Sequence, residues 1–102
     1  MSDLCESIQR FGKGIGNSCR YRLVQSLTAG PRTVSQLVEE LGQSQPAVSQ
    51  HLKVLKEYGL VSDERCGQEV VYSLNTVHIL SLLKNLTEAV TKNNADVRTI
   101  TN

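Results

Sequence analysis

The chain has 102 residues, with 11 basic and 10 acidic side chains, a formal net charge of +1 and no tryptophan. This length predicts one domain with a modest core, and the balanced charge does not by itself indicate a nucleic-acid partner. No apolar run approaches the ~18 residues of a spanning helix, and no signal peptide is recognisable, so a cytoplasmic protein without a membrane partner is expected. We expect residues 1–92 to form the domain and residues 93–102 to form a flexible tail.

Two helices are predicted in the N-terminal third of the chain. Apolar residues recur at helical spacing in segment 4–13, and the G-K-G-I-G stretch at residues 12–16 is expected to break this first helix. The second helix is expected to begin at a cap on Asn17 or Ser18 and to end near Ala29. Its apolar surface is expected to come from Tyr21, Leu23, Val24 and Leu27.

Two short helices joined by a tight turn are predicted over residues 33–58. The first, T-V-S-Q-L-V-E-E-L, opens with Thr33 and has a glutamine three residues later, which is a capping-box pattern. The second, S-Q-P-A-V-S-Q-H-L-K-V-L-K-E-Y, begins at a capping Ser44 and ends before Gly59. The three-residue connection starts with Gly42, and a glycine in a tight turn between short helices is typical of a helix-turn-helix.

The second helix of this pair has two contrasting faces. Val48, Leu52 and Leu55 fall on one face and predict a stripe buried against the core. The other face carries amide, hydroxyl and ammonium groups, which are the groups that contact bases and phosphates in a DNA major groove. The residues of this polar face are Gln45, Ser49, Gln50, Lys53 and Lys56.

After Gly59 the pattern of the sequence changes from helical to alternating. L-V-S-D-E-R and E-V-V-Y-S-L flank a glycine-bearing turn at residues 66–68, which predicts a β-hairpin. A last helix is expected from a cap at Asn75 or Thr76 to about Lys92. Its apolar side is expected to consist of Ile79, Leu80, Leu83, Leu86 and Val90.

The order of elements predicts a winged helix-turn-helix. Four helices, a two-stranded hairpin and a final helix make an α+β fold that is mostly α. The first and last helices carry more apolar surface than a small central core can cover, so we expect a homodimer formed through these two helices. A two-fold dimer would also place two recognition helices in successive major grooves, about 34 Å apart.

Five stretches of the sequence carry a family resemblance. They are G-N-S-C-R-Y-R-L-V at residues 16–24, V-S-Q-L at 34–37, S-Q-P-A-V-S-Q-H-L-K-V-L at 44–55, G-L-V at 59–61 and G-Q-E-V-V-Y-S-L at 67–74. In these stretches the chain resembles the ArsR/SmtB family of bacterial transcriptional repressors. The resemblance implies a homodimeric repressor that binds an imperfect inverted repeat of double-stranded DNA. It also implies release of that operator on sensing a metal or metalloid, an oxidant or a reactive sulfur species.

Two other classes of function compete with a DNA-binding regulator. One is a winged-helix protein-interaction module without DNA binding, and the polar face that carries Gln45, Ser49 and Gln50 argues against it. The other is an enzyme, which is not expected because the sequence has no P-loop, nucleophile elbow, paired carboxylates or metal-ligand cluster. No cofactor is predicted.

The resemblance places the family's DNA-reading positions at the start of the predicted recognition helix. They fall on Gln45, Pro46, Ser49 and Gln50, and the proline offers no polar contact at its position. Gln45 can make a bidentate contact to adenine, and Ser44 can cap the helix while its N-terminus meets a phosphate. Four further candidates for phosphate or minor-groove contacts, each of which is equally compatible with a solvated surface residue, are Lys53, Lys56, Arg65 and Gln68.

The metal sites of the family are not reproduced in this sequence. The family's thiolate-rich stretch C-V-C-D-L corresponds here to T-V-S-Q-L at residues 33–37. In the last helix His78 occupies one ligand position, whereas Thr76, Ala89 and Lys92 stand at the others. One ligand does not make a tetrahedral site, so no metal site is predicted.

The chain has three cysteines at wide spacing, which do not form a disulfide scaffold. Cys5, Cys19 and Cys66 are candidates for a thiol sensor, and the alternative is two small part-buried residues and one surface thiol. His51 lies between the two faces of the recognition helix. We expect it to make a structural hydrogen bond rather than to bind a metal.

Overall fold

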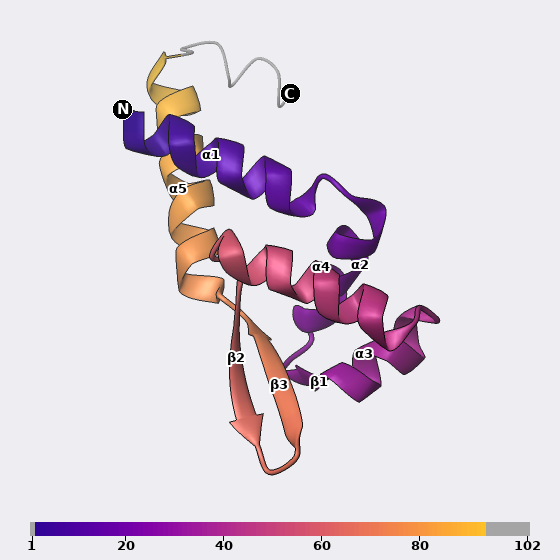
Figure 1. Cartoon of the computed structure of the whole chain (residues 1–102). Helices are drawn as coiled ribbons and strands as arrows, with labels where there is room; N and C mark the ends of the chain where they lie inside the picture. The colour runs from indigo at the N-terminus through magenta and orange to yellow at the C-terminus, as the bar shows by residue number, and fades with distance from the viewer. Residues whose placement is uncertain (1, 94–102) are drawn as a thin grey trace.

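The structure is a computed structural model that describes residues 2–93, with side-chain surroundings described for residues 6–92. It has the predicted winged helix-turn-helix architecture, mostly helical with one small antiparallel sheet (Figure 1). The predicted tail falls outside the described residues except for Asn93, which ends the last helix. In chain order the elements are α1 (Ser2–Ile15), α2 (Ser18–Leu27), β1 (Arg32–Thr33), α3 (Val34–Leu41), α4 (Gln45–Glu57), β2 (Val61–Cys66), β3 (Glu69–Leu74) and α5 (Thr76–Asn93).

The sheet contains one short strand, β1, that the sequence analysis did not predict. Its order is β1–β3–β2, and both pairs are antiparallel. Arg32 pairs with Tyr72 and Thr33 with Val71, so the outer edge of the hairpin is joined to the chain that leads into α3. A strand of two residues has no alternation that a sequence pattern could detect.

The first helix ends within the predicted stretch, but at Ile15 and not near Lys13, because α1 continues through Gly12 and Gly14. Gly14 is buried, and a Cβ at this position would lie 2.5 Å from Cδ1 of Leu60. The glycine therefore permits α1 to approach the core closely instead of ending the helix. Arg20 closes the end of α1, where its Nε donates to the Gly14 carbonyl at 2.6 Å and its Nη2 to the Lys13 carbonyl at 3.1 Å.

The core lies between α2, α3, α4 and the start of the hairpin. Each fully buried leucine or valine side chain contributes roughly 1.5–3 kcal/mol relative to an exposed one. The Ser26 hydroxyl is buried and donates to Glu40 Oε1 at 2.9 Å, so this polar group is satisfied. Tyr21, predicted to supply apolar surface, is instead 50% exposed. The buried apolar residues of the core are Leu23, Leu27, Leu37, Leu41, Val48, Leu52, Leu55, Leu60 and Val61.

Helix α5 carries an apolar surface that its own chain does not cover. α1 and α5 contact each other at one end of the molecule (Figure 1). The radius of gyration is 16.0 Å, whereas a compact domain of 100 residues has about 13 Å. No helix among residues 2–93 is long and apolar enough to cross a lipid bilayer. We call the uncovered residues, which are 37–80% exposed, the apolar stripe: Val77, Leu80, Leu83, Leu86 and Val90.

Candidate nucleic-acid interface

The helix-turn-helix is built by local interactions that the sequence predicts. The Thr33 hydroxyl accepts from the backbone N–H of Gln36 at 3.1 Å, and the Gln36 side chain accepts from the backbone N–H of Thr33 at 2.8 Å. This is the expected capping box at the start of α3. Gly42 follows α3 with a φ of 68°, a conformation that glycine adopts without steric cost. The turn therefore leads directly to Ser44, the cap of α4.

Both ends of α4 are closed by hydrogen bonds. The Ser44 hydroxyl accepts from the backbone N–H of Ala47 at 3.3 Å. At the other end Gly59 has a φ of 76°, and the N–H of Leu60 donates to the carbonyl of Leu55 at 3.0 Å. This C-terminal pattern is a Schellman motif, and both of its apolar residues are in the core. The position of α4 on the core is therefore well determined.

The two faces of α4 are divided as the sequence analysis predicts. Val48, Leu52 and Leu55 are 0% exposed and hold the helix on the core. The N-terminal half of the opposite face presents hydroxyl and amide groups to solvent, and these can donate to or accept from DNA bases. All the candidate DNA-contacting residues of this region are exposed: Ser44, Gln45, Pro46, Ser49, Gln50, Lys53 and Lys56.

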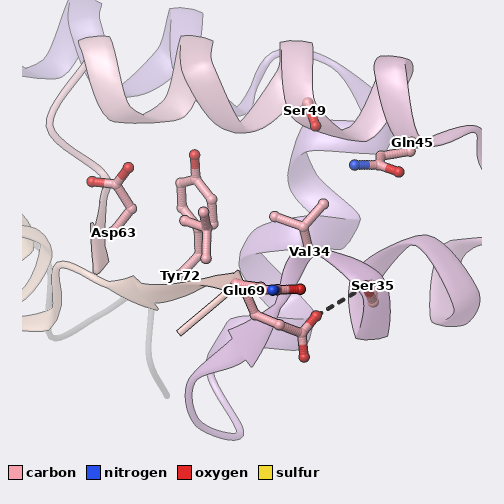
Figure 2. A pocket seen from close by; sticks show the side chains of 9 residues that line it. Val34, Ser35, Gln45, Ser49, Asp63, Glu69 and Tyr72 are labelled. Carbon is pink, nitrogen blue, oxygen red and sulfur yellow. Dashed lines mark hydrogen bonds between the residues drawn. The ribbon is translucent and has the colours of Figure 1, made fainter. Parts of the chain in front are cut away.

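A cleft of about 270 Å³ separates this face of α4 from the hairpin, which we call the wing. Figure 2 shows that side chains of α3, α4 and the wing all point into this cleft. Three of the candidate DNA-contacting residues, Gln45, Ser49 and Gln68, are brought together here although they are far apart in sequence. Residues that the sequence analysis did not select complete the lining: Val34, Ser35, Asp63, Glu69, Val70 and Tyr72.

The wing places two carboxylates in the cleft, and each has a partner on a helix. Asp63 Oδ1 lies 2.9 Å from Lys56 Nζ, in an ion pair between β2 and the last turn of α4. Glu69 Oε1 accepts from the hydroxyl of Ser35 on α3 at 3.2 Å (Figure 2). The sequence contains a signal for the first pair: two-residue alternation puts Asp63 on the same face of the hairpin as Val61, which is buried under α4.

Two side chains in or beside the cleft have raised pKa values. The hydrogen bond that Lys56 donates to the Asp63 carboxylate, reinforced by the negative charge of that carboxylate, raises the pKa of Lys56. Burial raises the pKa of Tyr72, and the charge of Asp63 adds to this increase. Tyr72 is the cross-strand partner of Asp63, so a single carboxylate acts on both groups.

The wing tip carries the remaining DNA-contact candidates, Arg65 and Gln68, and both are exposed. Gly67 has a φ of 67° at the first central position of the two-residue turn. Glycine is favoured at this position in hairpin turns because it adopts positive φ freely. The turn therefore holds Gln68 in the lining of the cleft described above.

Two arginines that precede the helix pair in sequence are used to close helix ends. Arg10 donates from Nη2 to the Glu57 carbonyl at 2.8 Å, and its Cζ lies 5.3 Å from the centre of the Tyr58 ring. Arg20, which closes α1, also places its Nη1 3.5 Å from Nδ1 of His51. His51 is half-buried, and this contact with Arg20 is the structural hydrogen bond that was predicted, although it is a long one.

The candidate thiols differ in their surroundings. Cys19 is half-buried at the start of α2 and packs against the core, whereas Cys66 is exposed at the end of β2. Both are free thiols. The side chain of Cys5 lies outside the described ones. Within the described part of the chain, no three His, Cys, Asp or Glu side chains lie together as they would around a metal ion.

Comparison with known sequences gives a family match that centres on the helix-turn-helix. Residues 17–63 match the family described as bacterial regulatory protein, arsR family. The HTH-type transcriptional regulator NmtR of Mycobacterium tuberculosis is 38% identical over 71 residues, which are 70% of this chain and 59% of NmtR. The chain thus spans about three fifths of the length of that relative. The transcriptional repressor SdpR of Bacillus subtilis is 31% identical over 85 residues, which are 83% of this chain and 94% of SdpR.

Solved structures give the same result for the fold. HlyU from Vibrio cholerae superimposes with a TM-score of 0.72 at 30% identity, covering 84% of this chain and 97% of HlyU. A homodimeric winged helix-turn-helix DNA-binding domain from Mycobacterium bovis, a possible ArsR-family regulator, has a TM-score of 0.69 at 25% identity. That similarity covers 91% of this chain and 89% of the Mycobacterium bovis domain.

Proposed function

The chain belongs to the arsR family of bacterial regulatory proteins, and on that premise we propose that it is a homodimeric transcriptional repressor. It binds an imperfect inverted repeat of double-stranded DNA. The observation that carries this proposal is the division of α4, whose leucine face is fully buried while its N-terminal polar face lies open at the cleft. A helix held in this way enters a major groove without rearrangement of the core.

In this proposal the two parts of the interface make different kinds of contact. Gln45, Ser49 and Gln50 contact base edges and so determine the sequence that is bound. Ser44 and the N-terminus of α4 meet a phosphate, as does Lys53 farther along the helix. Arg65 and Gln68 at the wing tip contact the DNA backbone or the minor groove beside it.

The dimer is proposed to form through α1 and the apolar stripe of α5. Large exposed apolar surfaces on a small protein are a common feature of protein–protein contacts. The stripe runs along a helix that extends from the core, which accounts for the large radius of gyration of the protomer. A two-fold axis at this contact makes the two α4 helices equivalent, and this matches the symmetry of an inverted repeat.

Release of the operator is proposed to depend on a chemical signal, namely a metal or metalloid, an oxidant or a reactive sulfur species. The metal ligands of related repressors are replaced at residues 33–37 and around His78, so the residues present do not fit those sites. The thiols are the remaining candidates, and Cys66 is the exposed one among the two described. An exposed thiol reacts most readily with oxidants and soft ions.

A salt titration of duplex binding tests the proposal. The association constant for the duplex should fall steeply as salt rises. A plot of its logarithm against the logarithm of the salt concentration should have a slope of about −0.9 for each phosphate that is neutralised. Repeating the measurement with reductant, oxidant, persulfide, arsenite and zinc tests for a signal. The absence of salt-dependent duplex binding would instead favour a winged-helix module that binds proteins.

The dimer has its own test by sedimentation. The wild-type chain should sediment as a dimer, and Leu83→Lys should sediment as a monomer because it places a charge in the apolar stripe. Lys84→Ala, at the next position of α5, is the matched control and should leave the dimer unchanged. A monomeric wild-type chain at micromolar concentration would contradict the proposed assembly.

A further inference from the structure

We infer that Asp63 limits the affinity of this protein for DNA by holding the ammonium group of Lys56 in an ion pair. A backbone phosphate must then compete with the Asp63 carboxylate for Lys56. The inference rests on the proposed function, because it concerns the strength of DNA binding at the same surface. It assigns Asp63 a role in setting affinity, which is distinct from base contact.

The Lys56–Asp63 ion pair lies beside the proposed DNA surface. Asp63 lines the same cleft as Gln45 and Ser49, and Figure 2 shows its carboxylate beside Tyr72 on the side that faces α4. Lys56 lies seven residues after Ser49 on the same helix, which is about 10 Å along its axis. This distance is close to the Debye length at physiological salt, about 8 Å, so the pair lies within electrostatic reach of a phosphate bound at the cleft.

The chemistry of the pair determines what a phosphate meets there. The distance between Lys56 Nζ and Asp63 Oδ1 is 2.9 Å, which is a charge-assisted hydrogen bond. The ammonium is therefore neutralised by a carboxylate before DNA arrives. The Lys56 side chain is 54% exposed, so a phosphate oxygen can reach it, whereas the Asp63 side chain is only 28% exposed.

A purely structural role for this pair is not needed, because other contacts hold the wing. β3 is paired with both β1 and β2, and β1 continues directly into the capped start of α3. Glu69 is joined to Ser35 at the other side of the cleft. An exposed ion pair adds little to stability, so its effect on the charge of the DNA-binding surface is the larger one.

The experiment measures duplex binding by fluorescence anisotropy, using the full chain and a mixed-sequence duplex of about 30 base pairs, long enough for two half-sites. Salt is varied from about 50 to 200 mM. Asp63→Asn should bind the duplex about fivefold more tightly. The attraction between two unit charges about 4 Å apart in water changes an equilibrium constant by about this factor. The log–log slope of this variant should be steeper than that of the wild type by about 0.9, the value for one additional phosphate contact.

Two further variants separate this effect from a general loss of negative charge. In a Lys56→Gln background, Asp63→Asn should raise affinity much less and leave the slope unchanged, because the lysine that it releases is absent. Glu64→Gln is the matched control: it removes the same charge from the next residue of β2, whose side chain points to the other face of the hairpin. It should change affinity much less than Asp63→Asn.

Each result has a definite meaning for the inference. An equal gain from Asp63→Asn with and without Lys56 would overturn it, as would an unchanged or weaker binding of the Asp63→Asn variant. The slope does not depend on the fraction of active protein, so a partly unfolded variant still gives an answer. If the wild-type chain shows no salt-dependent binding, the proposed function itself fails, and this outcome is distinct from the others.

Discussion

The recognition helix and the wing form the two sides of the same cleft, but they are stabilised in different ways. α4 has three side chains at 0% exposure and closed ends, so the core and the two caps determine its position. In the wing, every residue of β2 after Val61 is exposed. Asp63 of β2 binds Lys56, and Glu69 of β3 binds Ser35. Where the core fixes an element, its polar side chains remain available for DNA. In the wing, strand pairing with β1 holds the element, and the exposed polar side chains only add one ion pair and one hydrogen bond to the helices.

The largest expected effect follows from the dependence of α4 on the core. Leu52→Ala should lower the free energy of unfolding by about 2–5 kcal/mol, since it removes buried methyl groups and leaves a cavity. Urea denaturation monitored by circular dichroism measures this change. Val70→Ala in the wing is the comparison, and we expect roughly 1 kcal/mol or less because that side chain is only part-buried. Equal losses at the two positions would show that the wing is packed as tightly as the helix.

A smaller effect is expected when the available amide groups of the cleft are removed. Gln45→Ala should cost about 1–3 kcal/mol of discrimination between the operator and a mixed-sequence duplex, because a bidentate base contact is lost. Gln68→Ala at the wing turn should weaken binding to both duplexes alike. The operator is first selected from a random pool, and both affinities are then measured by anisotropy. If Gln45→Ala weakens both duplexes equally, Gln45 does not contact bases.

The sequence predicts α4 well because the signals for it are local. Its cap, its buried stripe and its glycine stop lie within sixteen residues, from Ser44 to Gly59, and the structure has α4 at Gln45–Glu57 between them. The capping box of α3 and the hairpin are predicted for the same reason. Periodicity and capping depend on neighbours in sequence, so one chain is sufficient to detect them.

The features that the sequence analysis missed depend on contacts between distant residues. Gly14 looks like a helix breaker until Leu60, 46 positions later, is packed against it. The Asp63 carboxylate lines the same cleft as Gln45 only because the hairpin folds back under α4. β1 is a strand because it pairs with β3. Two residues are too few for strand propensity to be detected in the sequence. The candidate interface was therefore predicted on its helix side and at the wing tip, while the carboxylates of its wing side were not.

A third prediction concerns the N-terminus of α4, where the polar face begins. Ser44→Ala should lower the free energy of unfolding by about 1 kcal/mol, because the backbone N–H of Ala47 loses its acceptor. Ser44→Asp retains a cap acceptor and should restore most of that stability. Thermal denaturation measures both variants. A Ser44→Ala protein as stable as the wild type would mean that the core holds this end of α4 without the cap.

The smallest expected effect is a loss of folding stability at alkaline pH. It should arise in the wing, because the exposed amides of α4 do not titrate. Burial raises the pKa of Tyr72 above its ordinary value of 10.0, so the folded protein favours the neutral phenol. The corresponding stability is fully present below pH 10.0 and is lost as pH rises from there through the raised pKa. Asp63 raises the pKa of Lys56 above 10.5, and the stability from this pair is likewise lost above that value.

Urea denaturation at about pH 9 and about pH 11 tests the role of Tyr72. Between these two pH values the urea midpoint should fall less for Tyr72→Phe than for the wild type. An identical fall in both proteins would show that Tyr72 ionises without disturbing the wing, and the alkaline loss would then have to come from elsewhere in the fold.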